Sequence, residues 1–337
     1  MQKTILEVIN LRKSFPHRKG VFASLGGQSI PIPAVDNVNL SLQEHETLGL
    51  VGESGCGKTT VGRSILRLTP VTSGRILFDN RDVLAMLPEE LRRMRGQMQM
   101  IFQDLDAALN PRMRVRDILS EAITVHNELS NAEAETRING LLEQVNLKKS
   151  KLASFPHELS GGEKRRVGIA RVLSVGPRFI VADEPTSALD VSIQAQIVNL
   201  LRDLQQQLGL SYLFISHDLR IVELVSHRVA VMYLGRIVEI GLSEHIANAP
   251  RHPYTRILWS SLVEKHSQEA FVASQAVRTD RWGVFDFEKP RTGCRFAPRC
   301  PMFISQGRPA ICIEPASEPE LKNIDDNSHQ VACHFPL

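Results

Sequence analysis

Apolar and polar residues alternate along the first part of the chain with the period of two that is typical of strands. This alternation predicts strands over residues 2–10, Val35–Leu42 and Glu46–Val51, and the polar stretch 17–33 predicts a loop between the first two. A glycine-rich turn over residues 52–59 comes next, and the first helix is predicted over Thr60–Leu66. The chain therefore passes from a strand through a glycine-rich turn into a helix.

The middle of the chain is helical in character from Pro88 to about Leu152. Three segments carry this pattern, namely Glu89–Arg95, Val115–Ile123 and Ala132–Val145. We expect them to form a helical insertion between the strand–helix elements on either side.

Strands and helices alternate again after this insertion. The predicted elements are a helix over 163–174, a strand over Phe179–Asp183, a helix over Ile193–Leu208, a strand over Leu210–Ser216 and a hairpin over 228–241 that turns at Gly235. Strands that alternate with helices predict an α/β fold, with a mostly parallel sheet covered on both faces.

The composition changes after about Pro250, where prolines, aromatic residues and four of the five cysteines gather. We place a domain boundary near 250–265 and expect residues 268–289 to be an irregular linker. The prediction is a first domain over 1–250, with a helical subdomain at about 88–175, followed by a small C-terminal extension over 251–337. No internal repeat is visible.

Composition and charge exclude several classes of protein. Of the 337 residues, 42% are hydrophobic and 23% are charged, as in ordinary globular proteins. A net charge of +3 gives no bulk attraction to nucleic acid. No apolar run approaches the roughly 18 residues that would span a bilayer. Glu7 and Asn10 interrupt the apolar core that a signal peptide would need. Five cysteines without a secretion signal favour metal or redox chemistry over disulfides.

The glycine-rich turn matches a phosphate-binding P-loop in both pattern and position, because it lies between a predicted strand and a predicted helix. Its glycines let backbone N–H groups point at phosphate oxygens, Lys58 would reach the β- and γ-phosphates, and Thr59 would bind Mg²⁺. We expect Cys56 to contribute through its backbone more than through its thiol. The predicted nucleotide-binding residues here are Gly52, Glu53, Ser54, Gly55, Cys56, Gly57, Lys58, Thr59 and Thr60.

Two carboxylates end the apolar strand Phe179–Asp183. Asp183 at the end of a strand is suited to hold Mg²⁺ beside the P-loop. Glu184 follows directly and is the natural general base for the attacking water.

With these motifs, the chain resembles the ATP-binding cassette (ABC) ATPase family over roughly residues 5–245. Ser160, Gly161, Gly162 and Glu163 resemble the family's signature segment, although family patterns more often have Gln at position 163. In the family this segment contacts the γ-phosphate of nucleotide on the other subunit's P-loop. The resemblance therefore implies two chains, head to tail, for a complete site.

Other positions match the family one at a time. Phe15 resembles the aromatic residue that stacks on adenine, and Gln103 resembles the glutamine that senses Mg²⁺ and contacts the transmembrane partner. Asp190, in the segment S187-A-L-D, resembles the loop that crosses the dimer interface. His217 resembles the switch histidine that bonds the γ-phosphate and the catalytic base. The resemblance thus implies catalytic roles for Lys58, Glu184 and His217.

The C-terminal residues narrow the resemblance further. R251-H-P-Y-T, together with the segment 293–301, resembles the tail of ATPase subunits of oligopeptide, dipeptide and nickel importers. Four thiols, the number that a tetrahedral Zn²⁺ site or an iron–sulfur cluster requires, follow in this tail. Their spacing alone favours zinc, whereas the importer resemblance implies a [4Fe–4S] cluster that staples the tail, with unligated thiols as a further alternative. The four are Cys294, Cys300, Cys312 and Cys333.

The resemblance implies an ATPase that powers import of peptides through separate transmembrane subunits. It further implies ATP and Mg²⁺ as cofactors and a peripheral position on the cytoplasmic face of the membrane. The implied partners are a second, related ATPase, two permease subunits and an extracytoplasmic binding protein, with no nucleic acid. A nickel, metal-chelate or opine importer is the alternative within this branch. A soluble ABC ATPase of translation or DNA repair is the alternative from another class, but such chains usually carry two cassettes or a long coiled coil.

Overall fold

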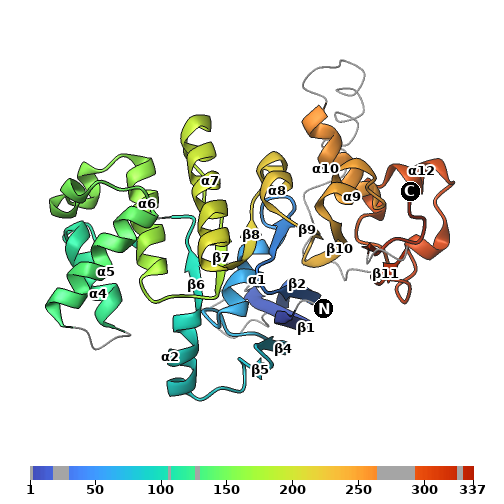
Figure 1. The fold of residues 1–337 in the computed structure, drawn as a ribbon. Coiled ribbons are helices and arrows are strands. Elements are labelled where there is room, and N and C mark those ends of the chain that lie inside the picture. Colours follow the sequence, from blue (N-terminus) through green and yellow to red (C-terminus); the bar gives the residue numbers. More distant parts are fainter. Residues whose placement is uncertain (1–2, 18–29, 105–107, 126–129, 264–292, 325–328) are drawn as a thin grey trace, which may run out of the picture.

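The computed structural model describes residues 3–17, 30–104, 108–125, 130–263, 293–324 and 329–337, and within them the strands form two sheets (Figure 1). The smaller sheet is antiparallel, with the order β2-β1-β4-β5. Its strands are β1 (Thr4–His17), β2 (Ile30–Gln43), β4 (Ser73–Phe78) and β5 (Arg81–Asp82).

The larger sheet has the order β11-β12-β10-β9-β3-β8-β7-β6. The strands from β9 to β6 run parallel, while β10, β12 and β11 are antiparallel to their neighbours. The strands are β3 (Thr47–Val51), β6 (Met98–Ile101), β7 (Phe179–Asp183), β8 (Ser211–Ile215), β9 (Arg228–Tyr233), β10 (Arg236–Leu242), β11 (Lys322–Asn323) and β12 (Gln330–Val331).

Both faces of the larger sheet are buried, because alternate residues of one strand enter different hydrophobic clusters. In β8, Tyr212 and Phe214 pack with the helical part of the chain, whereas Leu213 and Ile215 pack with α1 (Lys58–Ile65) and the smaller sheet. This is the two-faced burial that parallel strands require. The α/β architecture with a covered parallel sheet agrees with the prediction.

Helices occupy the connections between strands (Figure 1). The α-helices are α1 (Lys58–Ile65), α2 (Pro88–Gln97), α4 (Val115–Thr124), α5 (Asn131–Gln144), α6 (Gly161–Leu173), α7 (Val191–Leu208), α8 (Leu219–Val225), α9 (Ser243–Asn248), α10 (Pro253–Val263) and α12 (Pro301–Ser305). The 3₁₀ turns are η2 (Lys149–Ala153), η3 (Pro156–Glu158), η5 (Ala297–Arg299) and η6 (Ala310–Cys312).

The predicted helical insertion is interrupted by a strand. β6 pairs in parallel with β7, with Ile101 opposite Ala182, so it belongs to the main sheet. The side chains of Met98 and Met100 are buried in one cluster and that of Ile101 in the other, which is the alternation of a strand. The prediction of continuous helical character from Pro88 was therefore wrong at this point.

The C-terminal residues add strands to the main sheet. Ile240 of β10 lies opposite Gln330 of β12, and β11 pairs with β12 in turn. The tail is thus continuous with the larger sheet through this edge. The predicted linker over 268–289 lies outside the described residues, and the division of the chain into domains stays a prediction.

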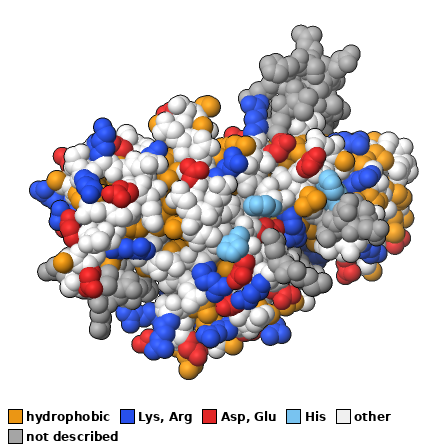
Figure 2. Space-filling view, in the orientation of Figure 1, with side chains coloured by type: hydrophobic (Ala, Val, Ile, Leu, Met, Phe, Trp, Pro, Cys, Tyr) orange, Lys and Arg blue, Asp and Glu red, His pale blue; other side chains and the backbone are white. Residues whose placement is uncertain are grey.

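The described helices include none that is both long and apolar enough to cross a bilayer. Basic and acidic side chains are interspersed on the face of the molecule shown in Figure 2, in keeping with the small net charge.

Candidate active site

The P-loop connects β3 to α1 and is held in place by close contacts that only glycine permits. Gly57 has φ 112°, and a Cβ atom there would lie 2.2 Å from the carbonyl oxygen of Ala34. Gly52 has φ 151°, and its Cβ would lie 2.2 Å from the carbonyl oxygen of Met232. Side chains at these positions would displace the loop from the strands that support it. The predicted strand–loop–helix context is therefore present.

The Lys58 side chain is buried and curls back over the loop. Its Nζ donates to the carbonyl oxygens of Gly52 at 2.8 Å and Glu53 at 3.0 Å. Its ammonium group is thus held over the space that the loop encloses, in position for an anion. Cys56 is buried beside it, and burial raises the pKa of its thiol, so the neutral form fills space in the loop.

Thr59 and Asp183 meet although 124 residues separate them in the chain. Thr59 Oγ1 donates to Asp183 Oδ1 over 3.0 Å. Burial raises the pKa of the Asp183 carboxyl, while the hydrogen bond from Thr59 opposes this effect. A hydroxyl and a carboxylate side by side are the hard oxygen ligands that Mg²⁺ prefers.

Glu184 lies at the centre of a second group of side chains. Gln103 Nε2 donates to Glu184 Oε2 over 2.8 Å, and His217 Nδ1 lies 2.9 Å from Glu184 Oε1. Glu184 adopts φ 45°, a left-handed conformation that is costly for a residue other than glycine and is typical of functional sites. Its N–H is fixed by the carbonyl oxygen of Ile215 at 2.9 Å. Two of the predicted residues, Gln103 and His217, thus converge on the carboxylate of a third, Glu184.

The predicted signature residues begin helix α6. Ser160 is the N-cap, and its Oγ accepts from the Glu163 N–H at 3.3 Å, while Glu163 Oε2 accepts from the Ser160 N–H at 3.0 Å. Lys151 lies 3.0 Å from the same carboxylate. These contacts hold the pKa of Glu163 below its usual range, first through the Ser160 N–H and then through Lys151. The charge of Glu163 is therefore compensated within the helix cap.

Gly161 and Gly162 pack against the segment that follows Glu184. A Cβ on Gly161 would lie 3.2 Å from Leu189, and one on Gly162 would lie 2.9 Å from Ile193. Asp190 caps α7, where its Oδ1 accepts from the Ile193 N–H at 2.9 Å. The signature segment thus contacts the predicted interface loop of its own chain.

The remaining predicted nucleotide-binding residues lie on β1, in the P-loop and at the start of α1. Phe15 lies on β1 and is 43% exposed, with Lys13 Nζ 4.6 Å from its ring centre. An exposed aromatic ring backed by a cation is available for stacking on a base. Ser54 and Gly55 are exposed at the tip of the loop, and Thr60 lies in the first turn of α1.

Sequence reasoning missed Arg165, which links the pieces of this site. It is buried in α6, and its guanidinium donates to the carbonyl oxygens of Phe102 at 3.0 Å, Gln103 at 3.4 Å and Ser187 at 3.3 Å. It thereby joins helix α6 to the segment after β6 that carries Gln103 and to the segment that follows Glu184. No sequence motif indicates this role, because its partners are backbone carbonyls.

The four C-terminal cysteines line one small cavity of about 20 Å³. Burial raises the pKa of the Cys294 thiol to about 11 and that of Cys333 to about 12, and the neighbouring thiols contribute to both increases. Within the described part of the chain, no group of three or more His, Cys, Asp or Glu side chains is arranged to hold a metal ion. The predicted metal staple is therefore not supported by this arrangement, although the thiols do converge.

Comparison with known proteins identifies the family. Residues 35–187 match the family described as ABC transporter, and residues 238–306 match the oligopeptide/dipeptide transporter C-terminal region. The oligopeptide transport ATP-binding protein AppF of Bacillus subtilis is 44% identical over 335 residues, which cover 99% of this chain and 98% of AppF. The chain belongs to the ABC transporter family. It is an ABC-type ATPase, and the resemblance indicated by its motifs is confirmed.

Other members of the ABC family agree with this assignment. The dipeptide transport ATP-binding protein DppF of Lactococcus lactis is 49% identical, over 77% of this chain and 81% of DppF. Among solved structures, a dimeric post-hydrolysis state of the ATP-binding cassette MJ0796 bound to ADP and Pi is 27% identical, with a TM-score of 0.61 over 71% of this chain and 98% of that one. The structure of cbiO1 from Clostridium perfringens gives a TM-score of 0.62 at 27% identity, over 81% and 99%. The expected ABC-type P-loop fold is thereby confirmed.

Proposed function

We propose that this chain hydrolyses ATP to power the import of peptides through separate transmembrane subunits, at the cytoplasmic face of the membrane. The observation that carries the proposal is the convergence of Gln103, Glu184 and His217 beside the Thr59–Asp183 pair. The names of the relatives AppF and DppF, which refer to oligopeptide and dipeptide transport, support peptides as the cargo.

The side chains have distinct roles in this proposal. Lys58 and the P-loop N–H groups bind the phosphates, and Phe15 stacks on the adenine. Thr59 and Asp183 would hold Mg²⁺, which would supply positive charge to neutralise the phosphate oxygens. Glu184 accepts the proton of the attacking water, and Gln103 and His217 fix the position of its carboxylate.

A second ATPase subunit completes the site in this proposal. Gly161 and Gly162 of the signature segment pack near Leu189 of their own chain's interface loop and Ile193 of α7, and the N-terminus of α6 offers donors to an anion from a partner. The similar cassette MJ0796, whose solved structure is dimeric, supports such a pairing. We infer a heterodimer with a related ATPase, bound to two permease subunits and supplied by an extracytoplasmic binding protein.

The substitution Glu184→Gln tests the proposed general base. We expect ATP turnover in the assembled complex to fall by about a hundredfold or more, because the amide cannot accept the proton. Peptide uptake should fall with it, while binding of ATP is retained. Glu89→Gln, on the exposed side of α2, is the matched control and should leave turnover unchanged. Unchanged turnover in Glu184→Gln would show that the base is another group.

We also propose that a [4Fe–4S] cluster is bound by four cysteines of the tail, with Zn²⁺ as the alternative. The four are Cys294, Cys300, Cys312 and Cys333. The proposal rests on the lining of one cavity by all four cysteines, while the described residues show no preformed site for a metal ion. A cluster is larger than a single ion, so its four thiolates stand further apart than the ligands of one ion. The chain's own contribution is the placement of four thiols on separate turns of the tail.

Protein purified without oxygen distinguishes the alternatives. We expect broad visible absorbance, together with iron and acid-labile sulfide, and loss of all three in Cys300→Ser. Colourless protein that contains zinc would contradict the proposal of a cluster. Colourless protein without any metal would contradict both the cluster and the zinc site.

A further inference from the structure

Two residues of the C-terminal tail, Tyr254 and Arg299, contact Glu53 of the P-loop. The Glu53 N–H donates to the hydroxyl oxygen of Tyr254 over 3.0 Å, and its carbonyl oxygen accepts from Lys58 Nζ at 3.0 Å. Its carboxylate accepts two hydrogen bonds from Arg299, at 2.9 and 2.8 Å. The backbone N–H, the backbone carbonyl and the side chain of Glu53 are therefore all engaged, two of them by the tail.

The two residues of the tail that hold Glu53 are themselves fixed by aromatic packing. The Arg299 guanidinium lies 5.8 Å from the ring centre of Tyr233 at the end of β9. Phe296, three residues before Arg299, packs edge-on against Tyr233 at 5.3 Å and against Tyr254 at 5.5 Å. Rigid aromatic neighbours restrict the guanidinium to the orientation that its two parallel hydrogen bonds require.

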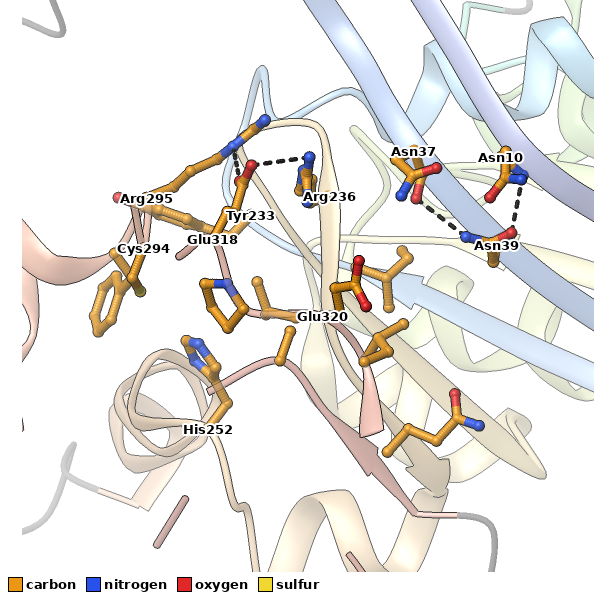
Figure 3. Close-up of a pocket in the computed structure, with 17 residues that line it drawn as sticks. Asn10, Asn37, Asn39, Tyr233, Arg236, His252, Cys294, Arg295, Glu318 and Glu320 are labelled. Carbon is orange, nitrogen blue, oxygen red and sulfur yellow. Dashed lines mark hydrogen bonds and ion pairs between the residues drawn. The ribbon is translucent and has the colours of Figure 1, made fainter. Parts of the chain in front are cut away.

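Ion pairs on the other side of this segment attach it to the core. Figure 3 shows Arg295 and Arg236 converging on Glu318, at the wall of a cavity of about 340 Å³ between the smaller sheet and the tail. Arg295 also pairs with Asp36 and donates to the carbonyl oxygen of Leu234 over 2.6 Å. The segment that carries Arg299 therefore has a fixed position relative to the P-loop.

The charge of Glu53 makes this contact consequential. A carboxylate in the P-loop lies close to the site of a triphosphate and repels it, unless a cation compensates for its charge. Arg299 supplies that cation in a bidentate pair, with its side chain 22% exposed. Tyr254 fixes the adjacent backbone, and the Glu53 carbonyl in turn positions the Lys58 ammonium.

We propose that Arg299 and Tyr254 are positioning residues of the ATP site, so that the C-terminal tail sets the affinity of the P-loop for nucleotide. This inference rests on the proposed ATP site and adds a part from outside the ABC core. Neither residue touches nucleotide in this proposal, because both act through Glu53.

Binding of Mg-ATP to the full-length chain tests the inference without relying on turnover. We expect Arg299→Gln to raise the dissociation constant about fivefold, the range of a well-oriented, partly exposed ion pair. Arg299→Lys keeps the charge but loses the bidentate geometry, so it should give a smaller increase. Tyr254→Phe should raise the dissociation constant in the same direction.

A double-mutant cycle separates positioning from general loosening of the tail. In a Glu53→Gln background the carboxylate is absent, and Arg299→Gln should then change the dissociation constant by less than about twofold. Arg251→Gln is the matched control, since Arg251 bonds the carbonyl oxygen of Leu337 at 2.6 Å and lies in the same tail. It should leave Mg-ATP binding at the wild-type value.

The outcomes distinguish this inference from the proposed function. Two results would contradict the assigned ATP site. One is that the wild-type chain does not bind Mg-ATP, and the other is that the Lys58→Ala variant binds Mg-ATP as tightly as the wild type. Normal binding by the wild type together with an unchanged dissociation constant in Arg299→Gln would overturn the positioning role alone. Equal losses in Arg299→Gln and Arg251→Gln, or equal effects of Arg299→Gln with and without Glu53, would also overturn it.

Discussion

The charge of the Glu163 side chain is compensated by contacts at the N-terminus of its own helix, α6. Family patterns more often have Gln at this position, and a carboxylate near a bound phosphate would be unfavourable. In the structure the carboxylate is turned back to the Ser160 N–H and is paired with Lys151 at 3.0 Å. This capping box retains the negative charge at the positive end of α6, where the helix dipole favours it. The departure from the family pattern therefore has a local physical compensation.

The substitution Glu163→Gln should lower the free energy of unfolding by about 0.5 kcal/mol at neutral pH, because the pair with Lys151 is lost while an oxygen remains for the cap. The folded state lowers the pKa of Glu163 below its ordinary value of 4.5. Its contribution is therefore present above that value and is lost as the pH falls through the lower, folded pKa. Urea unfolding of both proteins from neutral to acid pH measures this difference, which should vanish at the acid end.

Glu133→Gln is the matched control for this prediction, because Glu133 caps α5 on Ser130 in the same way. Added salt should reduce the effect of Glu163→Gln more than that of Glu133→Gln, since the ion pair is screened. Equal salt dependence of the two would mean that Lys151 contributes nothing to the stability.

At the scale of elements, Arg165 determines how α6 meets the segments around Glu184. We expect Arg165→Met to lower the free energy of unfolding by about 2 kcal/mol, because buried carbonyls lose charged donors. Turnover should fall as well, since the Gln103 and Ser187 backbones lose their common partner. Urea unfolding and steady-state ATPase assays of the assembled complex measure the two effects.

The neighbouring Arg166 provides the comparison for Arg165. Its guanidinium donates to the carbonyl oxygen of Val145 at 2.7 Å and to Gln196 at 3.3 Å, away from Glu184. Arg166→Met should therefore cost stability but leave turnover near the wild-type value. A similar loss of turnover in both variants would mean that α6 responds as a whole and that Arg165 has no special role.

The elements that were predicted well from the sequence are those whose chemistry requires particular residue types at particular positions. A P-loop needs glycines before Lys58, and a buried strand that ends in Asp183 and Glu184 has few other interpretations. β6 was missed because M98-Q-M-I is only four residues long and lies between helices. Arg165 was missed because backbone carbonyls carry no sequence signal. β12 was missed because a two-residue strand is specified by its partner β10, and pairing over such a distance leaves no local pattern.

At the scale of the whole molecule, a buried carboxylate on β10 is one of the points at which the tail is attached to the ATPase core. Glu239 of β10 is fully buried, and its oxygens accept from the N–H groups of Arg251 at 2.7 Å and His252 at 2.8 Å. His329 Nε2 lies 2.7 Å from the same carboxylate. Burial lowers the pKa of His252 to about 4, so this ring is neutral at physiological pH. Glu239 therefore fixes both the start of α10 and His329, the residue directly before β12.

Glu239→Gln replaces one carboxylate oxygen with an NH₂ group. This donor would then face the backbone N–H of Arg251 or His252, which is also a donor. We expect the free energy of unfolding to fall by about 3 kcal/mol, because a buried, fully hydrogen-bonded carboxylate leaves unpaired groups when it is changed. The exposed Glu244→Gln on α9 is the control and should have little effect. Since α10 carries Tyr254 to Glu53, the same variant should also weaken Mg-ATP binding under conditions where the chain is still folded. A loss of stability with unchanged nucleotide affinity would show that the attachment of the tail at β10 and its contact with the P-loop are independent.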